Sequence, residues 1–224
     1  MKKFIFILCL LVCFLGLTGF KSEEFTIENL DQYNKEFKTE EIEVCSTSST
    51  KTYMPYTAIT ATGSKQYKYI QEHMTVDATT GMLYDEDGFI GAALGYSFCE
   101  IGSRYYFTLD SGIVLPIVKV DAKASQDAPN GCSHAADASV IEFVIDAGIA
   151  TEYFGAGPTG LVKQGNFNND SRFKGSIEKI EKVLSDKIEE GVYYEEAVDT
   201  QESEKHLIGQ ADKELQLVGG IAQK

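Results

Sequence analysis

The chain has 224 residues and a formal net charge of −14, because 34 acidic side chains outnumber 20 lysines and arginines. Such an acidic surface repels nucleic acid and anionic membranes, which argues against both as partners. The sequence contains neither a zinc-binding spacing nor a glycine-rich loop in a phosphate-binding context, so we expect no metal and no cofactor.

The first twenty residues, MKKFIFILCLLVCFLGLTGF, have the layout of a secretory signal peptide. Lys2 and Lys3 precede an apolar run from Phe4 to about Leu17, shorter than the roughly 20 apolar residues of a membrane span. We therefore predict a signal peptide over residues 1–20 and a protein that is secreted or associated with the cell wall. Two alternatives stay open. The segment could be retained as a membrane anchor, since no clear cleavage pattern follows it, or Cys13 could be lipidated.

Residues 21–50 are predicted to be an acidic N-terminal segment, as a short helix or a flexible lead. Residues 51–185 have a different texture, because short apolar or alternating runs recur between Gly, Asp and Asn. These runs, TYMPYTAIT, GFIGAALGYSF, SRYYFTL, GIVLPIVKV and SVIEFVID, are typical of strands. LDSG, at 109–112, predicts a tight hairpin turn between two of them. The pattern therefore predicts one mainly β domain, either a small barrel or a sandwich.

The C-terminal part of the sequence is less definite. FKGSIEKIEKVLSDKIEE, which begins at Phe173, fits either a helical face or a last strand. GAGPTG at 155–160 predicts a turn. Residues 186–224 are predicted to be an acidic, loosely ordered tail with at most one helix.

Two aspartates lie at predicted strand ends. Asp121 ends PIVKV, and Asp137 opens SVIEFVID after a polar loop. A carboxyl group that is partly walled by apolar strands can keep its proton near neutral pH, as a general acid for glycosidic cleavage must. The alternative is that both aspartates only cap strands and turns, which Asp commonly does.

Export would leave Cys45, Cys99 and Cys132, so at most one disulfide can form within a chain, and its pairing stays open. A cysteine hydrolase would need Cys99 or Cys132 beside His134. The apolar context YSFCEIG suggests instead that Cys99 is a buried thiol. His134 could also orient Asp137 by a hydrogen bond.

Several stretches in this order, MPYTAITATG, GFIGAALGYSFCEIGSRYYF, VKVDAKA and DASVIEFVID, resemble the 3D (three-aspartate) domain over roughly residues 52–146. This domain is a six-stranded double-psi β-barrel found in secreted cell-wall proteins of Gram-positive bacteria and in membrane-bound lytic transglycosylase A. Tyr56, Thr57 and Ala58 match its first motif. Asp121 and Asp137 match its second and third aspartates. Gly95 stands where the first aspartate is expected.

The resemblance implies a small six-stranded double-psi β-barrel over residues 51–185 that acts on the glycan strands of peptidoglycan like a lytic transglycosylase. Asp137 would be the general acid/base and Asp121 a supporting carboxylate. Lys123, His134 and the hydroxyl of Thr57 would bind substrate. Because Gly95 replaces an aspartate, the alternative is a non-catalytic barrel that binds wall glycan, or a protein partner through its acidic surface.

Overall fold

The computed structural model describes residues 27, 30, 34–155 and 166–187. The chain divides into a unit that ends at Asp186 and a second unit from Lys187 onward, and the description below concerns the first. The predicted signal peptide, residues 156–160 of the GAGPTG turn and nearly all of the predicted acidic tail lie outside the described residues. None of the helices in the described ranges is long and apolar enough to cross a membrane.

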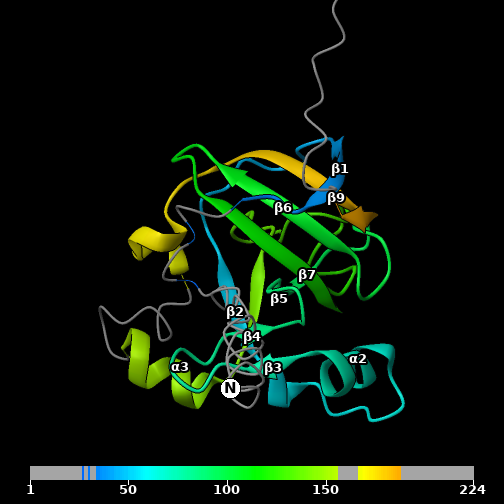
Figure 1. Ribbon diagram of the computed structural model, residues 1–224, viewed down its shortest axis with the longest axis vertical. Coiled ribbons are helices and arrows are strands. Elements are labelled where there is room, and N and C mark those ends of the chain that lie inside the picture. The colour runs from blue at the N-terminus through cyan, green and yellow to red at the C-terminus, as the bar shows by residue number, and fades with distance from the viewer. Residues whose placement is uncertain (1–26, 28–29, 31–33, 156–165, 188–224) are drawn as a thin grey trace, which may run out of the picture. The chain divides into compact units, whose positions relative to one another are not determined.

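The described residues form nine strands in one mixed sheet, with few helices (Figure 1). The strands are β1 (Phe37–Ile42), β2 (Thr52–Pro55), β3 (Thr75–Val76), β4 (Leu83–Tyr84), β5 (Ile90–Leu94), β6 (Arg104–Leu109), β7 (Val114–Ala122), β8 (Glu142–Ile145) and β9 (Ile177–Lys187). Their order is β1-β9-β6-β7-β5-β4-β3, and β8 joins β5 to β2. The prediction of a mainly β fold is confirmed, and the sheet is open over the described strands.

Pairing in the sheet is both parallel and antiparallel. β6 and β7 form the predicted hairpin around LDSG, with Leu109 accepting the amide of Gly112. β5 runs parallel to β7, and β2 runs parallel to β8. β8 is antiparallel to β5. The carboxyl ends of β5 and β7 and the starts of β8 and β2 therefore meet at one end of the sheet.

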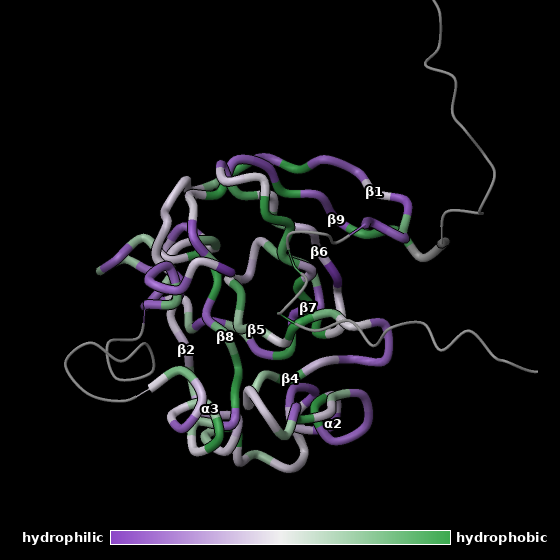
Figure 2. The backbone as a smooth tube through the Cα atoms, turned by 60° about the vertical axis from the view of Figure 1, so that its left-hand side comes forward, coloured by the Kyte–Doolittle hydropathy of each residue, from purple (hydrophilic) through white to green (hydrophobic). Residues whose placement is uncertain are grey.

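Apolar side chains cover both faces of the central strands, which makes two cores. Phe107, Ile117 and Phe143 belong to the larger cluster, and Tyr106 and Val118 belong to the smaller one. Successive side chains of a strand point to opposite faces, so neighbouring residues serve different clusters. All five residues of β5 are buried, as in a strand covered on both faces. Figure 2 shows the contrast between these central strands and the more hydrophilic β1.

The structure corrects the prediction for one segment and decides between two alternatives for another. Residues 37–42, expected in a short helix or flexible lead, form strand β1 beside β9. Cross-strand ion pairs hold the acidic strand there, including Lys179–Glu41 at 3.2 Å and Lys182–Glu40 at 3.5 Å. The ambiguous segment after Phe173 is a strand, β9, in which Ile177 and Ile180 are buried.

Two helices were missed from the sequence. Helix α2 (Lys65–His73) begins after Ser64, whose hydroxyl accepts the amide of Tyr67, and buries only Ile70. Helix α3 (Ala147–Phe154) begins after Asp146, whose carboxylate accepts two backbone amides. Both helices begin after a residue type that is common at the N-cap. Neither has the strong apolar periodicity that would predict a helix from the sequence. Short 3-10 turns lie at Tyr56–Ala58 (η2), Phe167–Asn169 (η3) and Ser171–Phe173 (η4).

Candidate functional site

A row of residues crosses four neighbouring strands at the end of the sheet where β5 and β7 finish. Ala93 of β5 is paired with Asp121 of β7 on one side and with Glu142 of β8 on the other. Glu142 is in turn paired with Thr52 of β2. Directly paired residues point to the same face of a sheet, so the two carboxyl groups flank the small Ala93 side chain. Two strand spacings separate their Cα atoms, which is about 10 Å.

A β-bulge in β7 places Asp121 on this face. Ala92 pairs with Lys119 and Ala93 pairs with Asp121, so Val120 is the extra residue between the two pairs. Because a bulge adds one residue, Lys119 and Asp121 point to opposite faces although they are two positions apart. Lys119 is thereby separated from the row, and its ammonium group binds three backbone carbonyls on the other side.

Both carboxyl groups of the row are half-buried, and burial is the main reason that their pKa values are raised. For Asp121, hydrogen bonds from the Ala122 amide and the Gln66 side chain, together with the charge of Lys119, oppose the rise in pKa. For Glu142, the charges of Lys123 and His134 oppose it, whereas the carboxylates of Asp121 and Asp137 add to it. Glu142 therefore feels two like charges in addition to burial, and it is the group best placed to hold a proton.

The charge of Lys123 opposes the rise in the pKa of Glu142 more than any other neighbouring charge does. Lys123 follows directly after the end of β7 and is buried, with its amide donating to the Leu94 carbonyl. Its ammonium group donates to the carbonyl of Ser139 at 2.9 Å and lies 3.4 Å from the hydroxyl of that residue. Burial lowers the pKa of Lys123, and the negative charges of Glu142, Asp137 and Asp127 oppose that change. The predicted substrate-binding Lys123 is therefore present at the site, with its donors directed at Ser139.

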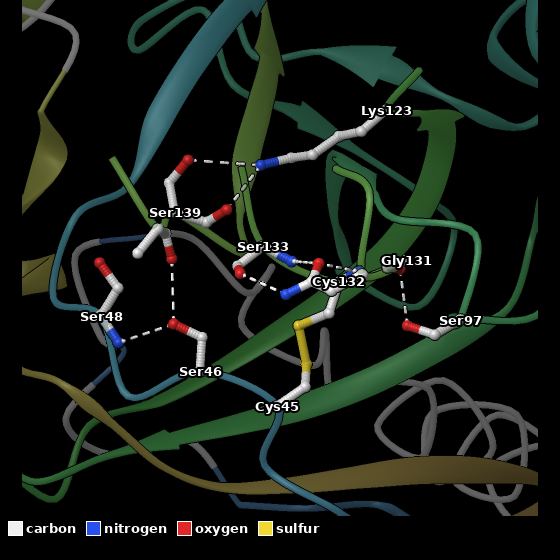
Figure 3. Close-up of a disulfide and its surroundings, with 11 residues drawn as sticks. Cys45, Ser46, Ser48, Ser97, Lys123, Gly131, Cys132, Ser133 and Ser139 are labelled. Carbon is white, nitrogen blue, oxygen red and sulfur yellow. Dashed lines mark hydrogen bonds between the residues drawn. A yellow bond between two sulfur atoms is a disulfide. The ribbon is translucent and has the colours of Figure 1, made fainter. Parts of the chain in front are cut away.

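The loop between β7 and β8 is tied to other parts of the chain around Cys132 (Figure 3). A disulfide between Cys45 and Cys132 ties it to the segment after β1, across 87 residues of sequence. On its far side, the Gly131 carbonyl accepts from both the amide and the hydroxyl of Ser97. The loop is therefore held by covalent and hydrogen-bonded contacts at its middle as well as by Lys123 at its base.

Asp137 lies in this loop, exposed, and does not begin a strand, since β8 starts at Glu142. Its carboxylate accepts the amide of Ser139 at 2.9 Å, which is an Asx turn. Burial alone would raise its pKa, but the hydrogen bonds from Ser139 and the charges of His134 and Lys123 outweigh burial and lower it. A lowered pKa does not favour a general acid, so the geometry gives no support to the role predicted for Asp137, which stays a prediction.

His134 is beside Asp137, as predicted, with 3.5 Å between its Nδ1 and a carboxylate oxygen. The same Nδ1 is 3.2 Å from the amide of Ala136, so its main contacts are within the loop. Thr57 is exposed in η2, at the opposite end of β2 from Thr52, which pairs with Glu142. The structure therefore does not bring the hydroxyl of Thr57 to the row.

Gly95, at the position of the expected first aspartate, is packed against the loop. A Cβ atom on Gly95 would lie 2.0 Å from the carbonyl oxygen and 2.5 Å from the carbonyl carbon of Gly131, both of them backbone atoms. Any side chain at this position would displace the loop. The absence of the first aspartate thus has a steric reason: the space is filled by the disulfide-tied loop.

The cysteine chemistry predicted as an alternative loses one of its two candidate thiols. Cys132 is oxidised in the disulfide, so it offers no thiol beside His134. Cys99 is free and exposed, in the turn region after β5, whereas the sequence suggested a buried thiol in a strand. Within the described ranges, no cluster of three or more His, Cys, Asp or Glu side chains is arranged to hold a metal ion.

No family model, curated protein or solved structure matches the chain. The resemblance to the 3D domain therefore stays a prediction, and the case for function depends on the geometry of the row.

Glu142 is the site residue that sequence reasoning missed. It sits inside the run SVIEFVID, which the sequence predicts to be a strand. A glutamate in the interior of an otherwise buried run is itself the available signal, because acidic side chains are seldom buried without a partner or a function. Its partnership with Asp121 depends on strand register, which the sequence does not reveal.

Proposed function

We propose that the protein is exported and cleaves the glycan strands of peptidoglycan in the manner of a lytic transglycosylase. The observation that carries the proposal is the Asp121–Ala93–Glu142 row. Two half-buried carboxyl groups with raised pKa values share one face of three adjacent strands. Carboxyl pairs held in this way are the usual apparatus for cleaving glycosidic bonds.

Glu142 is the proposed general acid and base. It protonates the glycosidic oxygen as the bond from that oxygen to the anomeric carbon breaks. The resulting carboxylate then takes the proton of the 6-hydroxyl group as that oxygen bonds to the anomeric carbon. Water is not consumed, so a second, water-activating carboxylate is unnecessary. Asp121, which receives hydrogen bonds from Ala122 and Gln66, stabilises positive charge at the anomeric carbon as a carboxylate.

Two features support the cellular and structural parts of the proposal. The Cys45–Cys132 disulfide is typical of proteins outside the reducing cytoplasm, which agrees with a signal peptide over residues 1–20. The two parallel pairs, β5–β7 and β2–β8, joined through antiparallel β5–β8, suit an incomplete or elaborated double-psi β-barrel over residues 51–185. We place the protein in the cell wall or outside the cell, as a relative of the 3D-domain family.

The test is incubation of purified protein with peptidoglycan, followed by mass spectrometry for anhydro-muropeptides. We expect the wild type to release them and Glu142→Gln to release at least about 100-fold less, which is the contribution of a general acid. Asp137→Asn serves as the matched control, and it should stay within a few-fold of wild type. Wild-type protein that releases no more product than Glu142→Gln would overturn the enzymatic proposal.

A second candidate is a non-catalytic domain that binds wall glycan or a protein partner through its acidic surface. The packing of Gly95 against Gly131 favours it, because no first aspartate can be accommodated beside the loop. Sedimentation with insoluble cell wall separates the cases. Retention without product indicates glycan binding alone, and absence of retention indicates a protein partner.

A further inference from the structure

A free thiol lies in the turn between β5 and β6. Cys99 is exposed and takes no part in the Cys45–Cys132 disulfide. Its backbone is fixed, because the ammonium group of the buried Lys119 donates to the Cys99 carbonyl at 2.9 Å. The residue is therefore held at one place on the surface, where a small molecule can reach its sulfur.

A buried hydroxyl group lies beside this thiol. Tyr105 of β6 is 1% exposed, and Phe98 and Phe107 pack against its ring, with centroids 5.2 and 6.3 Å away. Burial is the main cause of the raised pKa of Tyr105, and its interaction with Cys99 is the second. The hydroxyl forms no hydrogen bond of ordinary geometry to any described residue. A buried donor needs an acceptor, and the ionised sulfur of Cys99, or a sulfur bonded to it, can supply one.

A lysine ammonium group also reaches the thiol. Lys182 of β9 pairs with Tyr105 across the sheet, so both side chains emerge on the same face. The negative charge of an ionised Cys99 is the main cause of the raised pKa of Lys182, and a hydrogen bond between the two groups is the second. Glu40 of β1 shares this ammonium group, with 3.5 Å between oxygen and nitrogen. Two adjacent strands thus bring a hydroxyl donor and a cation to one sulfur.

These two neighbours favour the ionised form of Cys99. The hydrogen bond from the Tyr105 hydroxyl is the main reason that the pKa of the thiol is lowered, and Lys182 lowers it further against the effect of burial. The thiolate is the nucleophilic form of cysteine, whereas cysteines with a purely structural role are buried and inert. An exposed sulfur beside a buried hydroxyl and a cation has the surroundings of a reactive thiol.

We propose that Cys99 is a nucleophilic thiol that exchanges with the disulfides of small thiols, which leaves a mixed disulfide at this turn. The thiolate sulfur attacks one sulfur of the small disulfide, and a new S–S bond forms as the old one breaks. The other half of the small disulfide leaves as a thiolate with the bonding electron pair. The proton of the Cys99 thiol goes to solvent. The inference is independent of glycan cleavage.

The experiment measures the rate of adduct formation with hydroxyethyl disulfide, an uncharged probe, by intact-protein mass spectrometry over a range of pH. The control is Cys99→Ser combined with Gly63→Cys, because Gly63 is exposed and nothing lies within 4 Å of its Cβ position. We expect wild type to react about 3-fold faster than this control at pH 7, since the gain in thiolate exceeds the loss of nucleophilicity. The inflection of its pH–rate curve should lie at lower pH.

Two variants separate reactivity from a structural role. Tyr105→Phe keeps the buried ring and loses only the hydroxyl, and Lys182→Met loses only an exposed charge. We expect each to move the inflection towards that of the control thiol, whereas Lys182→Arg, which keeps the charge, should stay near wild type. Thermal melting of each variant shows whether the fold is kept.

The outcomes are distinct from those of the glycan assay. Wild-type protein with the same rate and the same inflection as the control thiol overturns the inference and leaves the proposed function untouched. Folded Tyr105→Phe and Lys182→Met variants that both keep the wild-type inflection also overturn it. Chains that link to each other through Cys99 and take up no small thiol contradict it as well, because the partner is then a second copy.

Discussion

Two regions of this protein carry acidic groups that the sequence placed in one site, and they hold those groups in different ways. On the strand row, Asp121 and Glu142 emerge from a sheet that is apolar on both faces, and burial raises their pKa values. On the loop, Asp137 meets the backbone amide of Ser139 and the charge of His134, and its pKa is lowered. The sheet raises the pKa values of its carboxyl groups, and the loop lowers the pKa of Asp137.

The difference shows what each kind of backbone can offer. The amides inside a strand are hydrogen-bonded to neighbouring strands, so few donors are available to a carboxylate there. Because the charged group also loses solvation, its ionised form is disfavoured. In a loop, backbone amides that are not paired with a neighbouring strand can donate hydrogen bonds to an aspartate. These hydrogen bonds stabilise the ionised carboxylate. Lys123 links the regions, because it lies near Glu142 and donates to Ser139.

Among the predictions, removal of the disulfide is expected to have the largest effect on the stability of the protein. Cys45 and Cys132 close a loop of 87 residues, for which the chain-entropy model gives about 4.6 kcal/mol of stabilisation. Replacement of both cysteines by serine should lower the unfolding free energy by about 2–5 kcal/mol in urea denaturation. Cys99→Ser is the control and should have little effect. A double variant as stable as wild type would mean that the loop does not depend on its covalent tie.

A substitution at Gly95 should cause the second-largest loss of stability. A side chain there meets the Gly131 backbone at 2.0 Å, so Gly95→Asp should cost about 3 kcal/mol and displace the loop. Gly63→Ala is the matched control, since nothing lies within 4 Å of its Cβ position. Melting curves compare the two. If Gly95→Asp is tolerated as well as Gly63→Ala, the steric explanation for the missing aspartate is wrong.

Lys123→Met should affect both regions, through the stability of the loop and the pKa of Glu142. The variant loses the hydrogen bonds to Ser139, which we expect to cost about 1–2 kcal/mol. It also removes the positive charge that lowers the pKa of Glu142, so that pKa should rise. The alkaline limb of the pH–activity profile should then move to higher pH. A profile that moves to lower pH, or does not move, contradicts the assignment of Glu142 as the acid.

The smallest expected effects are changes in Tm on replacing Asp121 or Asp137 by asparagine, and these two changes should have opposite signs. The pKa of Asp121 is raised in the folded protein, so its charged form costs stability once the pH rises through that pKa. Asp121→Asn should therefore raise Tm at pH 7 by about 2–4 °C. The pKa of Asp137 is lowered, so it contributes stability above its unfolded pKa that is lost as pH falls. Asp137→Asn should lower Tm by about 1–2 °C at pH 7.

Both differences should shrink in acid, where each aspartate is neutral in the folded and the unfolded chain. Calorimetry between pH 3 and pH 7 covers the relevant range. Shifts of the same sign for both variants at pH 7 would contradict the contrast between sheet and loop.

The sequence predicts the parts of this architecture that depend on local pattern. Alternating runs mark the central strands, and LDSG marks the hairpin. It does not predict the bulge at Val120, which decides the face to which Asp121 points, or the register that sets Glu142 opposite Ala93. Both are set by contacts between distant segments. The loop position of Asp137 was missed because ADASV resembles the start of a strand, whereas the Ser139 amide is used in a turn.

The central claim is that the strand row raises, and the loop lowers, the pKa values of their carboxyl groups. NMR titration of the side-chain carboxyl carbons tests it directly on the wild-type protein. We expect Asp121 and Glu142 to titrate above the ordinary pKa values of Asp and Glu, and Asp137 to titrate below that of Asp. A pKa of Asp137 above those of both row residues would contradict the account.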